Sequence, residues 1–185
     1  MKSKLVGLIT LLTALLVAPT CVYAIPIISI QPPTPTVTAG QTFSLDVDIA
    51  AVADLYAFQF DIGFDPALLS AVSISEGPFL PSGGATIFFP GTIDNFAGTI
   101  AFNADSLVGA IPGVTGNGTL LTIDFVALAA GISSIDISNE VFLDSSFNAI
   151  AVDNAGATIT IPAPSTLALF AAILPLGTWI RRQKY

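Results

Sequence analysis

Carboxylates are nearly all of the side chains in this chain that could do acid–base or metal chemistry. The 185 residues include 13 Asp and Glu, 5 Lys and Arg, no His and a single cysteine, Cys21. Catalytic triads that need a His base are therefore excluded. The five basic residues lie only at the two ends, so residues 25–161 hold all 13 acids and no cation. Because phosphate groups are bound mainly by Lys and Arg, we expect neither nucleic acid nor nucleotides as partners.

Paired carboxylates could still act as general acid and base, as they do in glycoside hydrolysis. The acids of the strand-like segments instead alternate with Phe, Val, Leu and Ile: Asp46, Asp48, Asp61 and Asp124. Alternation of this kind places them on the solvated face of a strand. We therefore predict that the chain is not an enzyme.

Calcium binding is a second use of such residues, because oxygen ligands select calcium over transition metals. Asp144, Ser146 and Asn148 carry oxygen atoms at alternate positions, as at the start of a calcium loop. Ala149 stands where that loop needs Gly, and Ala155 where it needs Glu. Two interpretations stay open, a calcium site and an Asx-type turn between two strands. No other cofactor is expected.

Aromatic side chains could bind sugars by stacking, for which exposed Trp and Tyr are best suited. Tyr56 is the only one of these in residues 25–161, and its spacing places it on the inward face with Phe58 and Phe60. Four further aromatic residues lie beside Gly- and Pro-rich turns: Phe79, Phe88, Phe89 and Phe96. They are either plugs that close one end of the domain or an exposed apolar patch for a partner.

Strands are the elements that must position these residues. Apolar and polar residues alternate in residues 42–49 and 56–64, and shorter alternating runs follow Gly98, Gly118 and Gly131. Turn residues separate these runs, and Asn117-Gly118 favours one such turn. No run has a helical period long enough for βαβ units. We predict an all-β sandwich over residues 25–161.

The N-terminal residues 1–24 have the features of a secretory signal peptide. Lys2 and Lys4 precede an apolar run at residues 5–17, and Val22-Tyr23-Ala24 allows cleavage after Ala24. A buried N-terminal helix is the alternative. Cleavage would remove Cys21 and leave the mature chain without a thiol.

Residues 162–185 resemble the PEP-CTERM sorting signal of Gram-negative bacteria. A Pro- and Ser/Thr-containing motif precedes apolar residues 167–180 and a basic end, in the order Pro162, Pro164, Ser165, Thr166, Arg181 and Arg182. Ala163 stands where that signal usually has Glu. The resemblance implies export, transient membrane retention through the tail, and processing by an exosortase. An ordinary C-terminal membrane anchor is the alternative.

The middle of the chain resembles cohesin domains. Residues 54–66 (DLYAFQFDIGFDP) are similar to an early strand and turn of that family, and residues 116–125 (GNGTLLTIDF), 131–133 and 141–144 to its later strands. Carbohydrate-binding modules with a related sandwich share parts of this pattern. The resemblance implies a jelly-roll sandwich of about nine strands. It also implies a protein partner on a sheet face or edge, which is a dockerin in cellulosomes.

We therefore expect three parts: a signal helix at residues 1–24, a cohesin-like β-sandwich at 25–161 and a hydrophobic sorting or anchor helix at 162–185. The expected function is non-catalytic protein–protein attachment at the cell surface or in the exopolysaccharide matrix of a Gram-negative bacterium. Polysaccharide binding and a structural matrix or adhesin role are the alternatives.

Overall fold

The computed structural model describes residues 24–31 and 36–163. Within these ranges lie one short 3-10 helix, η1 (Leu80–Gly83), and ten strands. The strands are β1 (Ile27–Gln31), β2 (Thr42–Phe64), β3 (Leu69–Glu76), β4 (Thr86–Phe89), β5 (Thr92–Asp94), β6 (Thr99–Leu107), β7 (Val114–Ala127), β8 (Gly131–Asp144), β9 (Asp153–Ala155) and β10 (Ala157–Ile161). The predicted all-β fold is confirmed.

The predicted flanking helices fall in residues 1–24 and 162–185, almost entirely outside the described residues. In the part that is described, no helix is long and apolar enough to cross a membrane.

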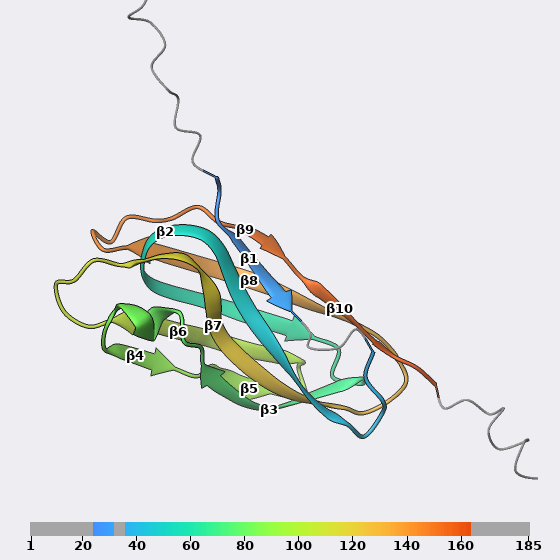
Figure 1. Ribbon diagram of the computed structural model, residues 1–185. Coiled ribbons are helices and arrows are strands. Elements are labelled where there is room, and N and C mark those ends of the chain that lie inside the picture. The colour runs from blue at the N-terminus through green and yellow to red at the C-terminus, as the bar shows by residue number, and fades with distance from the viewer. Residues whose placement is uncertain (1–23, 32–35, 164–185) are drawn as a thin grey trace, which may run out of the picture.

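Strand β2 belongs to both layers of the sandwich. Its first half pairs with β1 and β7, and its second half pairs with β6 and β8. The strand therefore runs along one layer, bends back and continues in the other, as Figure 1 shows. One layer has the order β9–β1–β2–β7–β3, and the other has β10–β8–β2–β6. Strands β4 and β5 follow one another along the outer edge of β6. Residues 42–49 and 56–64, predicted as two strands, are thus one bent strand.

The bend in β2 is held by polar contacts on either side of the buried Val52 and the exposed Ala53. Ala51 and Asp54 both have a φ of 57°, in the left-handed region that most residues avoid. The backbone N–H of Ala51 donates to Oδ1 of Asn117 at 2.6 Å, and that of Asp54 donates to Oγ1 of Thr115 at 2.9 Å. Residues 116–118 lie inside β7 opposite this bend, so the prediction of a turn at Asn117-Gly118 is wrong. Its Asn side chain stabilises the bend instead.

The carboxylate of Asp54 joins the bend to two other segments. It accepts the backbone N–H of Gly113 at 2.7 Å and the hydroxyl of Ser145 at 2.6 Å. The Ser145 hydroxyl is the main cause that holds the pKa of Asp54 below its usual value. The short side chain of Asp also tolerates a left-handed backbone better than most residues do.

The core lies between the two layers, where the inward residues of β2 meet those of β7 and β8. Phe58, Phe60 and Phe142 form one aromatic cluster, with ring centroids 5.5–6.5 Å apart. In a second cluster, the Phe125 ring lies 6.0 Å from Phe43 and 5.2 Å from Phe64. The inward positions predicted from alternation in residues 42–49 and 56–64 are buried. Tyr56 is also inward, and its hydroxyl donates to the carbonyl of Gly109.

The outward positions of the β1–β2–β7–β3 layer form cross-strand pairs between carboxylates and hydroxyls. Asp124 accepts the hydroxyls of Ser44 and Ser73, each at 2.6 Å. Both hydrogen bonds lower the pKa of Asp124, and the one from Ser44 has the larger effect. Two similar pairs, each at 2.7 Å, join β7 to β2: Thr122 with Asp46 and Thr119 with Asp48. The predicted polar face is confirmed for this layer.

We expect Asp54→Asn to lower the free energy of unfolding at pH 7 by about 1–2 kcal/mol, because an amide cannot accept hydrogen bonds with both of its polar atoms. The stabilisation from a lowered pKa is present above the unfolded-state value near 3.8 and is lost as the pH falls through the folded-state value. The difference between variant and wild type should therefore shrink at acid pH in urea unfolding. Asp153→Asn, at an exposed position, is the control; equal stability of both variants at pH 7 would contradict the expectation.

Candidate binding face

The outer face of the β8–β2–β6–β4 layer carries two rows of residues that run across four strands. One row is formed by Leu143, Ala57, Ser106 and Ile87, which are opposite one another in successive strand pairs. The next row is formed in the same way by Val141, Gln59, Ala104 and Phe89. Apart from Gln59, small residues thus occupy the middle of the face, and large apolar residues occupy its two sides.

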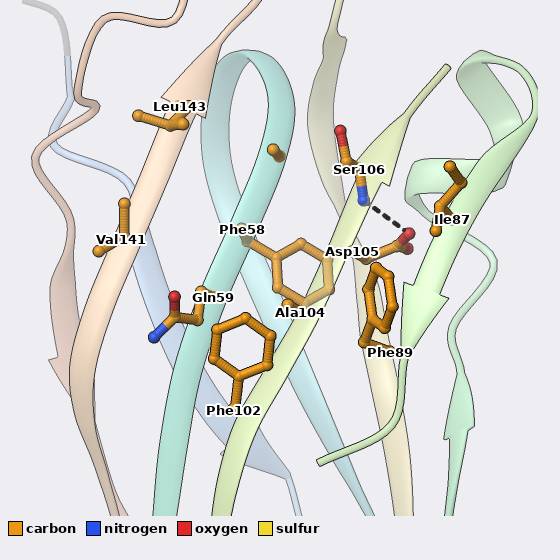
Figure 2. A pocket seen from close by; sticks show the side chains of 11 residues that line it. Phe58, Gln59, Ile87, Phe89, Phe102, Ala104, Asp105, Ser106, Val141 and Leu143 are labelled. Carbon is orange, nitrogen blue, oxygen red and sulfur yellow. Dashed lines mark hydrogen bonds between the residues drawn. The ribbon is translucent and has the colours of Figure 1, made fainter.

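This distribution of sizes hollows the face. A depression of about 330 Å³ lies over Ala57, Ala104 and Ser106. Val141 and Leu143 stand on one side of it and Ile87 and Phe89 on the other, as Figure 2 shows. Phe89 and Ile87 are 55% and 52% exposed although both are large and apolar. Contiguous exposed apolar surface of this kind is typical of interaction sites.

Phe102 stands at one end of the depression because two strands bulge there. It has a φ of 61°, and its backbone N–H donates to Oδ1 of Asp61 at 2.7 Å. The other oxygen of Asp61 accepts from the amide of Asn139 on β8 at 2.6 Å. Asn139 also has positive φ, and the pairing of β2 with both neighbours shifts register at this level. Asp61, predicted to be merely solvated, thus fixes the bulges on both sides of β2.

Asp105 lies beneath the same face, on the inward side of β6. It is 2% exposed, and its Oδ1 accepts the backbone N–H of Ser106 at 2.8 Å (Figure 2). Burial, with a further contribution from the neighbouring Glu76 carboxylate, raises the pKa of Asp105 to about 7. The sequence pattern indicates no special role for this residue, because its environment depends on which strands flank β6.

The four Phe residues predicted as plugs or as a patch do not come together. Phe79 is buried and packs against Gly118, so it is a plug. Phe88 packs against the core from β4, whereas Phe89, the next residue, points to the outer face. Phe96 is 97% exposed in the turn between β5 and β6 and does not line the depression. Four further residues line the depression without any signal in the sequence, because nothing local indicates that their strands are neighbours: Ile87, Phe102, Val141 and Leu143.

The segment predicted as a calcium site or an Asx-type turn has the hydrogen bonds of the turn. Oδ1 of Asp144 accepts the backbone N–H groups of Ser146 and Asn148, each at 2.8 Å, and Oδ2 accepts the side-chain amide of Asn148 at 3.0 Å. The Asn148 amide is the main cause that lowers the pKa of Asp144. Within residues 24–31 and 36–163, no three acidic residues come together as a metal-binding group. Calcium binding by Asp144, Ser146 and Asn148 stays a prediction.

The predicted sorting motif is almost entirely outside the described residues. Pro162 directly follows β10, and Ala24 is the first described residue. The remaining motif residues lie beyond the described part: Pro164, Ser165, Thr166, Arg181 and Arg182.

Known proteins match the described domain over nearly its whole length. The profile of the cohesin domain family matches residues 28–162. A non-cellulosomal cohesin from the hyperthermophilic archaeon Archaeoglobus fulgidus is similar in structure, with a TM-score of 0.61 and 13% identity over 80% of this chain and 98% of that chain. A type II cohesin domain from the cellulosome of Acetivibrio cellulolyticus has a TM-score of 0.62 and 19% identity over 74% and 95%. No curated protein matches in sequence.

A third similar structure is a type I cohesin–dockerin complex from Clostridium thermocellum, with a TM-score of 0.62 and 18% identity over 75% of this chain and 99% of that one. These solved chains contain the matched domain and little else. The buried core residues of the present chain likewise all come from this domain, the first being Ile28 and the last Ile161. A fragment of residues 24–163 therefore contains the complete fold.

We expect Asp61→Ala to lower the free energy of unfolding by about 1–2 kcal/mol, because it leaves the Phe102 N–H and the Asn139 amide without their carboxylate. The amide resonance of Phe102 should shift strongly in NMR spectra of the fragment. Asp136→Ala is the matched control, since Asp136 is an exposed acid on β8 with one hydrogen bond, from Ser134 at 3.2 Å. If the two variants are equally stable and the Phe102 resonance is unmoved, Asp61 does not hold the bulges.

Proposed function

Because the chain belongs to the cohesin domain family, we propose that it is a non-catalytic attachment module that binds a dockerin-like protein. The observation that carries this proposal is the hollowed apolar face of β8, β2, β6 and β4. Ile87, Phe89 and Phe102 are each more than half exposed at its rim. Their burial against a partner would remove a continuous apolar surface from water.

The charge of the domain defines the chemistry of that partner. Residues 25–161 carry 13 acids and no basic residue. A partner that presents an apolar ridge flanked by Lys or Arg would fill the depression and match the surrounding negative potential. The same potential disfavours anionic polysaccharides.

Polysaccharide binding is the second candidate, and the described aromatic residues favour it less. Tyr56, the only Tyr or Trp among them, is 7% exposed, and its hydroxyl is engaged by Gly109. Flat stacking on sugars would have to use Phe89 or Phe102, which lack a polar group. A structural matrix role would require self-association, which the negative charge opposes unless divalent cations bridge the copies.

The proposed place of action is the cell surface or extracellular matrix of a Gram-negative bacterium. The supporting features are the signal-like residues 1–24 and the PEP-CTERM-like residues 162–185. In this proposal a signal peptidase cuts after Ala24, the tail holds the domain at the membrane, and an exosortase processes the tail.

We expect Phe89→Ser and Phe102→Ser each to weaken binding of a dockerin partner by at least about tenfold, as loss of a central aromatic contact usually does. The partner would be captured on the immobilised 24–163 fragment from the secreted fraction of the source organism, purified, and titrated by calorimetry with calcium present. Phe96→Ser is the matched control, because Phe96 is exposed but away from the face. Equal weakening by all three variants would place binding elsewhere, and capture of sugar alone would favour the polysaccharide alternative.

A second expectation concerns the two ends of the chain. Mass spectrometry of protein exported by a Gram-negative host that has an exosortase should find Ile25 as the first residue and a loss of the tail. Replacement of Arg181 and Arg182 by Ser should leave the tail uncut, because the basic end holds the hydrophobic segment in its orientation. A tail that stays intact in the unaltered protein would support a permanent anchor instead.

A further inference from the structure

Asp105 has an unpaired oxygen in an apolar environment. Its two cross-strand neighbours are Phe58 on β2 and Phe88 on β4, and the residue is 2% exposed. Oδ1 accepts the N–H of Ser106, but Oδ2 has no hydrogen-bond partner among the described residues. A buried ionised oxygen without a partner is strongly unfavourable, so something must satisfy it.

The carboxyl group of Glu76 could be the missing hydrogen-bond partner of Oδ2, provided that one of the two carboxyl groups carries a proton. Glu76 ends β3 and accepts the hydroxyl of Thr86, which lies on the same side of β4 as Phe88, the residue paired with Asp105. Its carboxylate also contributes to the raised pKa of Asp105. Two ionised carboxylates can only accept, so they repel each other. One proton between them turns the repulsion into a hydrogen bond and satisfies Oδ2.

Within residues 24–31 and 36–163, no basic side chain could balance the charge of Asp105. No Lys, Arg or His occurs between Lys4 and Arg181. The strands on either side present Phe58 and Phe88, and β6 itself presents Asn103, whose amide donates to the carbonyls of Phe60 and Ile100. Glu76 is the one titratable group that acts on Asp105. A calcium ion would need six to eight oxygens, and no third acid joins the pair within the described residues.

We propose that Asp105 and Glu76 share one proton, and that loss of this proton as the pH rises loosens β4 and the Ile87–Phe89 wall of the binding face. Strand β4 is four residues long and pairs only with β6. Its Phe88 covers Asp105 from the inside, and the adjacent Phe89 forms the wall outside. Water drawn to a newly ionised Asp105 would disturb the packing of Phe88 and Phe89 on this short strand, because Asp105 is paired with Phe88 and borders the depression. Only the consequence for partner binding rests on the proposed function.

The direction of the pH dependence follows from linkage. The folded protein holds the proton more tightly than the unfolded chain, because the pKa of Asp105 is raised from 3.8 to about 7. Its contribution to stability is therefore complete below the unfolded-state value and declines as the pH rises to about 7. Because the pKa of Asp105 is about 7, the loss of the proton falls near neutral pH.

The titration is measured directly by carboxyl ¹³C NMR on the 24–163 fragment. We expect the Asp105 resonance to titrate near pH 7, and we expect Glu76→Gln to move its midpoint to lower pH, because a Gln amide donates to the ionised carboxylate without repelling it. An Asp105 midpoint near 4 in the wild type would overturn the proposal. So would a midpoint that Glu76→Gln leaves unchanged.

Hydrogen exchange of the β4 amides tests the mechanical consequence. After correction for the intrinsic exchange rates, protection of β4 should fall at least about tenfold between pH 6 and pH 8 in the wild type, while protection of β7 stays constant. Asp105→Asn should abolish the fall, because the Asn amide donates to Glu76 at every pH. Asp153→Asn, at the exposed acid of β9, should behave as wild type.

Two outcomes of the exchange experiment would overturn the proposal: a β4 protection that does not depend on pH, and a protection at pH 8 that calcium restores. The second would assign the pair to a cation instead of a proton. Neither NMR measurement needs a partner. A failure here leaves the attachment function standing, and a failure to find a dockerin leaves the titration standing.

Discussion

The acids of this domain have no cationic side chain to pair with, and this constraint organises the polar part of the structure. Hydroxyl groups and backbone N–H groups take the place of Lys and Arg. On the outer face of the β1–β2–β7–β3 layer, hydroxyls on three strands donate across to Asp46, Asp48 and Asp124. At Asp54 and Asp61 the same kind of donor fixes backbone that would otherwise be unfavourable. Carboxylates without counterions thus become the residues that specify bends and bulges.

Asp105 does not fit this pattern, and it lies between the core and the candidate binding face. The acids on the outer faces have donors within reach, whereas Asp105 lies between two Phe residues under the face. Its charge state is therefore coupled to the packing of a short edge strand. That strand carries two of the large apolar residues, Ile87 and Phe89, that surround the depression.

The face itself results from residue size and strand register acting together. Ala57, Ala104 and Ser106 are small, and register places them side by side between two larger pairs. A slip of one residue in β6 would turn its outward side chains inward and erase the depression. The bulges held by Asp61 protect that register, which explains why a polar residue at the centre of the layer matters for an apolar surface.

Sequence alone determined the features that depend on local order. Strict alternation in residues 42–49 and 56–64 specified strands and their buried faces, and the lack of basic residues in 25–161 argued against phosphate-binding functions. The similarity of residues 54–66 and 116–125 to cohesins specified the family. Tertiary structure decided the rest. Only the fold makes one bent strand of residues 42–64, and only strand pairing unites Ile87, Phe102 and Val141 on one face. The environment of Asp105 likewise depends on strands that are distant along the chain. Periodicity is a property of neighbouring residues, whereas register and bulges arise from contacts between segments that are far apart in sequence.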